Sequence, residues 1–407
     1  MLKKISLVLF LLAFFALQMM GQKFEKLALT PPMGWNSWNI FACDINEDKI
    51  REIADAMVET GLRDAGYEYV VIDDCWHGQR DSLGFIQADP QRFPSGIKAL
   101  VDYIHSKGLK FGLYSDAGNT TCGGRPGSRG HEYQDALTYA AWGVDYLKYD
   151  WCDTDGLSGI GAYTTMNQAL RQAGRPILFS LCDWGHNKPW EWAGEIGHMW
   201  RTTGDIHNCF DCAHDNGGWY SWGVLKILDM HEGFNIRQYA GPGRWNDPDM
   251  MEVGNGMRVN EDRAHFALWA MLAAPLIAGN DIRSMTPETH EILTNAEVIA
   301  INQDSLGIQA FRYAKEGDLE TWVKPLNNDQ WAICFLNRGE APIDLTFEFK
   351  GRKIEDSLTQ KTVDFDHTLY KIRDVWAKKM IGTTKKALVT TIPSHDVLQV
   401  VLTPKTK

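Results

Sequence analysis

Positive charge is in short supply in this sequence. Its 407 residues contain 41 Lys and Arg against 52 Asp and Glu, which gives a formal net charge of −11. Because nucleic-acid phosphates are bound by clustered cations, this balance argues against a nucleic-acid partner. Low-complexity tracts are absent too, and 44% hydrophobic and 23% charged residues are ordinary values for a globular protein. We therefore expect a folded chain rather than an extensively disordered one.

Long apolar runs are also few, and the sequence has one, near its start. Lys3 and Lys4 precede an apolar run from Ile5 to Met20, and no second run of that length follows. This order is typical of a secretory signal, so we predict a signal peptide over residues 1–21 and a secreted or periplasmic protein with no membrane contact after its removal. A retained anchor is the alternative, although the run is short for a span of about 20 residues. Eight cysteines in an exported chain favour some disulfides.

The sequence lacks a convincing metal, nucleotide or serine-nucleophile motif. Cys209 and Cys212 precede His214, but a fourth ligand for structural zinc is not evident nearby, so a local disulfide or two free thiols is favoured. The glycine-rich stretch 156–161 has no P-loop lysine after it. The histidines have neither metal-protease spacing nor a nucleophile elbow beside them. We therefore predict that the protein needs no metal ion and no organic cofactor.

One unit recurs between about residues 31 and 281: an amphipathic helix, a glycine, a short apolar strand and then carboxylates. In one such unit, apolar residues from Ile50 to Val58 follow helical spacing and stop at Gly61, and the strand after them ends in Asp73-Asp74. Alternating helices and strands predict a parallel sheet, and eight strands over about 250 residues match a (β/α)8 TIM barrel. An open doubly wound sheet is the alternative. The expected strands are 32–38, 69–72, 109–114, 144–149, 176–181, 198–202, 239–245 and 275–278.

The pattern changes after about Phe311. Short alternating segments at 319–323, 331–336, 343–349 and 397–402 are separated by turn-forming residues, which is typical of antiparallel strands. We therefore predict a catalytic barrel over residues 24–310 and a C-terminal β-sandwich domain over 311–407. The second domain lacks the acid clusters of the first, so we assign it a packing role.

Carboxylates at strand ends are the main candidates for chemistry, because barrel active sites lie at the carboxyl ends of the strands. Lys148 stands two residues before Asp150, so both side chains point to one side of the strand, where the ammonium would keep the carboxylate ionised. Asp205 follows Arg201 by four residues and Gly204 directly. For Lys148 and Asp150 the alternative is a buried structural pair, and for Arg201 and Asp205 it is a surface ion pair. Two facing carboxylates are the minimum equipment for glycoside hydrolysis.

Tryptophans gather at the same strand ends. Their flat apolar faces and polar edges suit the C–H faces of a sugar, although core packing is the commoner explanation for any one of them. Six in one region predict a sugar or polyol pocket. They are Trp35, Trp38, Trp76, Trp151, Trp184 and Trp245.

Several longer motifs run in order through the chain. They are Thr30–Trp38 (TPPMGWNSW), Ile72–Trp76 (IDDCW), Gln87–Pro94, Tyr114–Gly118, Lys148–Asp150, Trp200–Arg201, Asp205, Trp245–Met250 (WNDPDM), Ile299–Asp304 and Ile392–His395. With these motifs the sequence resembles glycoside hydrolase family 27, the α-galactosidase (melibiase) family, across most of its length.

The resemblance implies a retaining exo-acting α-galactosidase that removes terminal α-galactosyl units by double displacement, with a carbohydrate as its partner. By position, Asp150 resembles the nucleophile and Asp205 the acid/base, so we expect their carboxyl groups about 5–5.5 Å apart. The resemblance also implies disulfides Cys43–Cys75 and Cys122–Cys152 and a free Cys182. The residues implied to bind substrate are Trp38, Asp73, Asp74, Tyr114, Lys148, Cys182, Asp183, Trp184, Arg201 and Asp249.

Some positions depart from the family pattern. Asp183 stands where many relatives carry Glu, Trp151 is bulkier than the Asn or Gly expected there, and the stretch 208–220 is longer. β-L-Arabinopyranosides and α-N-acetylgalactosaminides therefore stay open as substrates, while the Asp73-Asp74 pair favours galactose. Two other classes also stay open, a carbohydrate-binding protein without activity and a metal-dependent barrel hydrolase.

Overall fold

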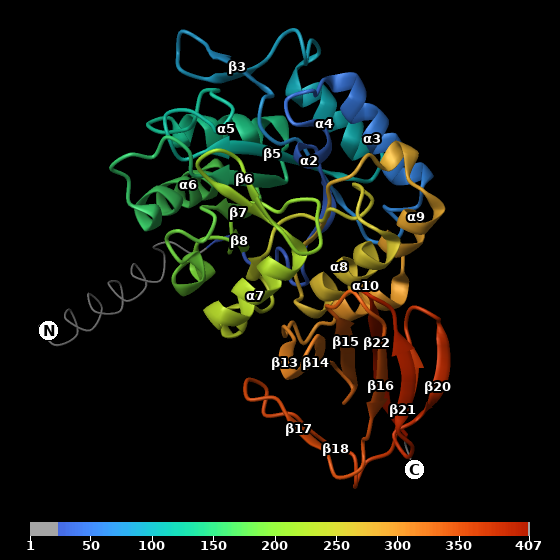
Figure 1. Ribbon diagram of the computed structural model, residues 1–407. Helices are drawn as coiled ribbons and strands as arrows, with labels where there is room; N and C mark the ends of the chain where they lie inside the picture. The colour runs from blue at the N-terminus through green and yellow to red at the C-terminus, as the bar shows by residue number, and fades with distance from the viewer. Residues whose placement is uncertain (1–22, 406–407) are drawn as a thin grey trace, which may run out of the picture.

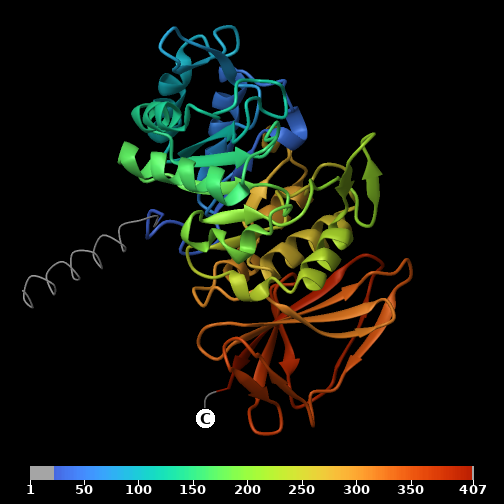
Figure 2. The same cartoon turned by 90° about the vertical axis from the view of Figure 1, so that its left-hand side faces the viewer.

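The computed structural model describes residues 23–405 and contains a barrel and a smaller all-β region (Figure 1). The signal peptide predicted for residues 1–21 lies outside the described residues. The barrel takes the blue-to-yellow part of the chain and the β region the orange-to-red part, and the two pack against one another in both views (Figures 1 and 2). No helix in residues 23–405 has the length and apolar character needed to cross a membrane.

Eight parallel strands form the barrel sheet, in the order β11-β8-β7-β6-β5-β2-β1-β12. The first strand pairs with the last, as in a barrel and unlike an open doubly wound sheet, so the predicted (β/α)8 architecture is confirmed. Most strand residues are buried because helices cover the sheet from outside. The strands are β1 Met33–Asn36, β2 Tyr69–Val71, β5 Lys110–Asp116, β6 Tyr146–Asp150, β7 Leu178–Cys182, β8 Met199–Arg201, β11 Trp245–Asp247 and β12 Leu276–Ala278.

The register of neighbouring strands sets the height at which their polar ends lie. Asp116 of β5 pairs with Asp150 of β6, and Asp150 pairs in turn with Cys182 of β7. The carboxyl ends of three strands are therefore level with one another. Side chains at these positions meet at one edge of the barrel.

Helices and two short hairpins connect the strands. The predicted helical residues from Ile50 to Val58 fall within α3. Glycines with positive φ end α5 and α6, at Gly143 (φ 88°) and Gly174 (φ 79°). The helices are α2 Trp38–Phe41, α3 Glu47–Glu59, α4 Gly96–Ser106, α5 Glu132–Trp142, α6 Gly159–Ala173, α7 Val224–Phe234, α8 Val259–Met271, α9 Pro287–Leu293 and α10 Ala296–Asn302. The hairpins are β3 His77–Arg80 with β4 Ile86–Ala88, and β9 Ala213–Asp215 with β10 Tyr220–Trp222.

The prediction of a strand at 239–245 is wrong for most of that range. Arg237–Tyr239 is a short 3-10 helix, and β11 begins only at Trp245. The intervening glycines form a turn in which the amide of Gly241 donates to the carbonyl of Arg244 at 2.7 Å and Gly243 has a φ of 79°. Because of this turn, β11 begins at Trp245 and ends at Asp247.

The barrel closes through an irregular segment after β11. Met251 forms a parallel bridge with Ala278 of β12, and its amide donates to the carbonyl of Ile277 at 2.7 Å. Asp249 lies two residues before this bridge. The seam of the barrel therefore carries one of the predicted site residues.

The C-terminal region is an antiparallel β domain that packs on helix α8. Its main sheet has the order β13-β14-β15-β22-β19-β20, and Trp322 and Leu336 of this sheet belong to the same apolar cluster as Trp269 of α8. The buried Lys324 ammonium donates to the carbonyls of Ala270 and Ile301 in the barrel. The strands are β13 Phe311–Glu316, β14 Leu319–Pro325, β15 Trp331–Asn337, β16 Ile343–Phe347, β17 Lys353–Glu355, β18 Thr362–Asp364, β19 Tyr370–Asp374, β20 Lys379–Thr383, β21 Leu388–Ile392 and β22 Val397–Pro404.

Candidate active site

A cavity at the carboxyl ends of the barrel strands brings together most of the predicted site residues. It encloses about 390 Å³ when its open mouth is included, which is within the range of small-ligand pockets. Both candidate catalytic acids line it. The lining residues are Trp38, Asn39, Asp73, Asp74, Tyr114, Cys122, Lys148, Asp150, Trp184, Arg201, Asp205, Asp249 and Met250.

Asp150, the last residue of β6, is 5% exposed. Burial raises its pKa to about 6, although the charge of Lys148 opposes this shift. The charge of Asp205 raises the same pKa, so the two carboxylates lie close enough to interact. Asp150 is therefore mostly ionised at neutral pH.

Asp205 is more open to solvent, with a side chain 35% exposed. The Arg201 guanidinium binds its carboxylate at 3.0 Å and that of Asp249 at 2.8 Å, so one arginine holds both acids. Asp249 has a φ of 100°, which is rare for a residue with a side chain. Its carboxylate accepts the amides of Ile206 and Met250 at 2.9 and 2.7 Å. These contacts stabilise the strained backbone at the barrel seam.

Asp73 forms the buried ion pair of the site. The Lys148 ammonium contacts its carboxylate at 2.8 Å, and the Asn36 amide donates to the same oxygen at 2.7 Å. The charges of Asp73 and Asp150 raise the pKa of Lys148 well above its usual value, although burial opposes this. Lys148 therefore binds Asp73 directly and acts on Asp150 through its charge.

Asp74 is held by the loop that follows β5. Its carboxylate accepts the Thr121 hydroxyl at 2.9 Å and the Gly123 amide at 2.7 Å. Burial raises the pKa of Asp74, and these hydrogen bonds oppose the shift. Cys122 lies between the two donors and is disulfide-bonded to Cys152. A covalent link thus restrains the loop that orients Asp74.

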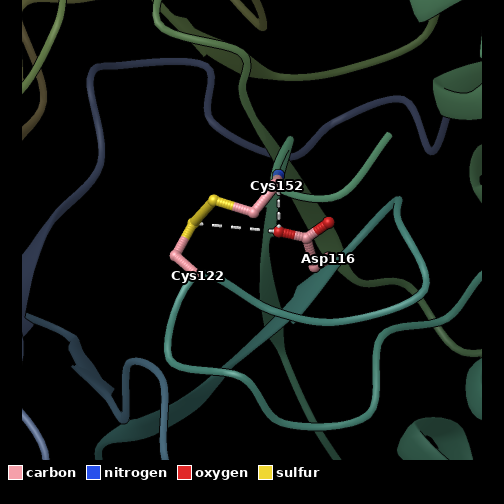
Figure 3. Close-up of side chains that lie close together, drawn as sticks. All are labelled: Asp116, Cys122 and Cys152. Carbon is pink, nitrogen blue, oxygen red and sulfur yellow. Dashed lines mark hydrogen bonds between the residues drawn. A yellow bond between two sulfur atoms is a disulfide. The ribbon is translucent and has the colours of Figure 1, made fainter. Parts of the chain in front are cut away.

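Asp116 anchors the other side of this disulfide (Figure 3). Its carboxylate accepts the Cys152 amide at 2.9 Å and the Gly118 amide at 2.7 Å. Burial, followed by the charge of Asp150, raises its pKa to about 8, so it carries a proton at neutral pH. Figure 3 shows the Cys122 and Cys152 sulfurs bonded to one another beside Asp116, which leaves no thiolate there for a metal ion.

Tyr114 contributes a hydroxyl without a hydrogen-bond partner among residues 23–405. The side chain is buried, and its ring lies 5.2 Å from the Lys148 ammonium. Buried hydroxyls normally have partners, and this one belongs to a cavity-lining residue. The Tyr114 hydroxyl is therefore available to a group that enters the cavity.

The cavity as a whole offers the two candidate catalytic carboxylates and a ring of hydrogen-bonding groups. A carboxylate can attack an electrophilic carbon, and a carboxyl group can exchange a proton with an oxygen. Trp38 and Trp184 provide apolar faces beside these polar groups. This combination suits a polyhydroxylated ring with one bond to be cleaved.

Known proteins resemble this chain throughout its described length. A family model described as "Alpha galactosidase A" matches residues 30–304, and one described as "Alpha galactosidase C-terminal beta sandwich domain" matches residues 316–402. The chain belongs to the α-galactosidase (melibiase) family.

Individual relatives within the α-galactosidase family span both domains. The "Alpha-galactosidase A" of Cellvibrio japonicus is 57% identical over 390 residues, which cover 96% of each chain. The structure of α-galactosidase I from Mortierella vinacea has a TM-score of 0.86 and 39% identity, covering 94% of this chain and 99% of that one. The Saccharomyces cerevisiae α-galactosidase solved with raffinose has a TM-score of 0.85 and 32% identity, covering 95% and 100%.

Two of the predicted substrate-binding residues of this α-galactosidase family member do not line the cavity. Asp183 is fully buried, and its carboxylate accepts the amides of Gly185 and Asn187 at 3.1 and 3.0 Å, so it shapes the turn that carries Trp184. Cys182 is a free thiol that donates to the Asp150 carboxylate. It lines a small adjoining pocket with Lys148 and Arg201.

Three lining residues were absent from the residues predicted to bind substrate. Asn39, on the short helix after β1, donates to Glu252 at 2.6 Å, and no local pattern marks it. Met250 follows Asp249 directly, so the motif around it was the available signal. Cys122 was predicted as a disulfide partner, and the structure also places it in the cavity wall. The structure joins Cys43 to Cys75 and Cys209 to Cys212 as well.

Proposed function

We propose that this chain is an exo-acting retaining α-galactosidase that releases terminal α-D-galactosyl residues from oligo- or polysaccharides. One observation carries the proposal: Asp150 and Asp205 line a single cavity together with the Asp73-Asp74 pair. The family membership agrees with it, because the relatives named above are α-galactosidases. The expected carboxyl separation of about 5–5.5 Å stays a prediction.

The proposed reaction has two displacement steps. In the first, an oxygen of Asp150 bonds to the anomeric carbon while Asp205 gives its proton to the departing glycosidic oxygen. In the second, Asp205 takes a proton from water, and the water oxygen displaces Asp150 from the same carbon. Two inversions leave the product with the anomeric configuration of the substrate, and both acids return to their starting states.

The other lining residues would bind the sugar. The carboxylates of Asp73 and Asp74 are acceptors for two sugar hydroxyls, and Lys148 and the Tyr114 hydroxyl are donors. Arg201 and Asp249 form a third polar group beside Asp205. Because Lys148 and Arg201 are themselves fixed by carboxylates, the binding groups are preorganised before substrate arrives.

The decisive variant is Asp150→Asn. Loss of the nucleophilic oxygen should lower kcat on an aryl α-galactoside by at least about a thousandfold, while the thermal midpoint stays within a few degrees of the wild-type value. Asp155→Asn is the matched control, because this acid lies on the loop after β6 and outside the cavity. Retained activity in Asp150→Asn refutes the assignment. NMR of the first product formed should show the α anomer.

A substrate panel separates the alternatives. Aryl α-galactoside, β-L-arabinopyranoside and α-N-acetylgalactosaminide should be cleaved with the galactoside first, because the arabinopyranoside lacks the hydroxymethyl group that the Asp73-Asp74 side would bind. Sugar binding without product release would indicate a binding protein that has lost activity. Full activity in the presence of a chelator is expected, and inactivation would favour a metal-dependent hydrolase.

We also propose a role for each of the two domains and a cellular location for the protein. Catalysis is assigned to residues 24–310 and a packing role to 311–407; in support, all cavity-lining residues precede residue 251, and β13 begins at Phe311. Three disulfides in the described residues support a secreted or periplasmic location, where such bonds persist. Fractionation of producing cells, with N-terminal sequencing of the mature protein, tests both the location and cleavage near Gly21.

A further inference from the structure

A hairpin after β8 presents aromatic rings to solvent beside the candidate acid/base. Figure 2 shows β9 and β10 as a yellow-green arm that projects from the barrel. Trp219 and Tyr220, at the turn and the start of β10, are 53% and 48% exposed. Large exposed aromatic side chains on a soluble protein commonly mark a binding surface. Neither residue lines the cavity described above.

The base of this hairpin is hydrogen-bonded to the backbone of Asp205. The amide of Trp222 donates to the Asp205 carbonyl at 2.8 Å, and the amide of His207 donates to the Trp222 carbonyl at 2.8 Å. The Trp222 indole also lies against Gly204, where an added Cβ would meet its nitrogen at 3.0 Å. The hairpin is thus a direct extension of the segment that carries Asp205.

Several contacts fix the hairpin in place. The Cys209–Cys212 disulfide and a 2.9 Å hydrogen bond from the Gly223 amide to the Cys212 carbonyl close its base. The rings of His207 and His214 stack with centroids 4.1 Å apart, and the Asn216 amide group donates to the Ser221 hydroxyl at 3.0 Å. A surface held this way costs little entropy when a ligand binds.

The rings of Tyr220 and Trp222 form a short platform beside the segment that carries Asp205. Tyr220 and Trp222 are two residues apart on β10, so they share a face of the strand, and their rings stack with centroids 5.7 Å apart. The strand β10 runs alongside this segment, because Ile206 forms a parallel bridge with Trp222 and a Cβ added at Gly204 would lie 3.3 Å from the Tyr220 carbonyl oxygen. Trp219 directly precedes β10, at the turn of the hairpin.

The chemistry identifies what would occupy the platform. An acid/base residue must lie beside the oxygen that it protonates, which is the glycosidic oxygen of the leaving group. The leaving group therefore emerges on the Asp205 side of the cavity, where the hairpin is attached. A leaving group that is itself a sugar offers C–H faces that stack on Trp and Tyr rings.

We propose that the hairpin of residues 208–222 is a leaving-group subsite in which Trp219 and Tyr220 bind the sugar unit attached to the terminal galactose. This rests on the proposed function and deepens it, because it names the residues that would set the preference between leaving groups. Trp219 and Tyr220 are then specificity-determining residues, with no part in the cleavage of the bond.

The test compares two substrates that share the galactosyl group and differ in the leaving group. Raffinose carries a sugar leaving group, whereas α-galactosyl fluoride releases fluoride, which has no ring to stack. In the Trp219→Ala/Tyr220→Ala variant, kcat/KM on raffinose should fall about tenfold or more, mostly through KM, and kcat/KM on the fluoride should stay within twofold of wild type. Tyr133→Ala, which removes a 41% exposed ring on α5, is the matched control and should change neither value.

Each other outcome overturns the proposal in a distinguishable way. Equal losses on both substrates would mean that the hairpin supports Asp205 and binds no leaving group. No loss on either would mean that the rings are not a sugar platform. If the double variant changes the sedimentation coefficient of the protein, the rings form a contact between copies of the chain. Failure of the wild-type protein to cleave the fluoride would refute the proposed function itself.

Discussion

Burial controls the protonation of Asp150, the proposed nucleophile. Asp150 is almost wholly inaccessible, and desolvation raises its pKa to about 6 in spite of the nearby Lys148 ammonium. The sequence suggested that Lys148 keeps this carboxylate ionised, and the structure shows a balance in which burial has the larger effect. The Lys148 ammonium contacts the Asp73 carboxylate directly instead.

A pH profile tests this balance. Attack on the anomeric carbon needs ionised Asp150, so kcat/KM should fall as pH drops through about 6, by about tenfold per pH unit below it. In Lys148→Met the acid limb should move to higher pH, because the charge that lowers the Asp150 pKa is gone. An acid limb near pH 4 in the wild-type protein would contradict the burial argument.

The Tyr114 hydroxyl gives a second prediction for a single residue. It has no hydrogen-bond partner among the described residues, so Tyr114→Phe should leave the free energy of unfolding unchanged or raise it by up to about 1 kcal/mol. If a sugar hydroxyl is the missing partner, kcat/KM should fall by roughly 3-fold to 10-fold. Denaturant unfolding and steady-state kinetics measure the two effects. Reduced stability with unchanged kinetics would assign the hydroxyl to the fold instead.

Among the structural elements, the loop after β5 contacts both Asp74, which follows β2, and Cys152, which follows β6. It supplies the Thr121 and Gly123 donors to Asp74, and the Cys122–Cys152 disulfide ties it to the residue two positions beyond Asp150. The local sequence predicts neither set of donors, because the loop has no regular pattern. Its conformation is set by what it contacts.

Removal of that disulfide tests the role of the loop. The bond closes a loop with a sequence separation of 30 residues, so Cys122→Ala/Cys152→Ala should lower the free energy of unfolding by about 2–4 kcal/mol. KM should rise as Asp74 loses its orientation. Cys334→Ala is the control, since this buried free thiol lies on β15 of the C-terminal domain and outside the cavity. A KM in Cys122→Ala/Cys152→Ala equal to that of the control would argue against a positioning role.

For the molecule as a whole, the apolar core of the barrel continues into the β domain, which also has a second core of its own. Trp322, Leu336 and Val397 of the β domain cluster with barrel residues such as Trp269, and Arg338 forms an ion pair across the interface with Asp229 at 2.6 Å. These contacts support the packing role proposed for the C-terminal domain. The β domain covers apolar surface that the barrel cannot leave exposed.

Truncation tests this dependence. A chain of residues 24–310 should aggregate or lack a cooperative thermal transition, because the apolar surface of α8 loses its cover. Size-exclusion chromatography and calorimetry, with residues 24–407 prepared in parallel, make the comparison. A soluble, active barrel would show that the two cores are energetically independent.

The sequence by itself determined the architecture and the family and predicted the two acids, because these depend on periodicity and on motifs that are local in the chain. The tertiary structure decided which groups meet. Asp183 caps a turn instead of entering the cavity, Lys148 binds Asp73, and the β9–β10 hairpin is attached at Asp205. These outcomes depend on strand register and barrel closure, which bring together residues distant in sequence, and burial at that junction sets the pKa values that the chemistry requires.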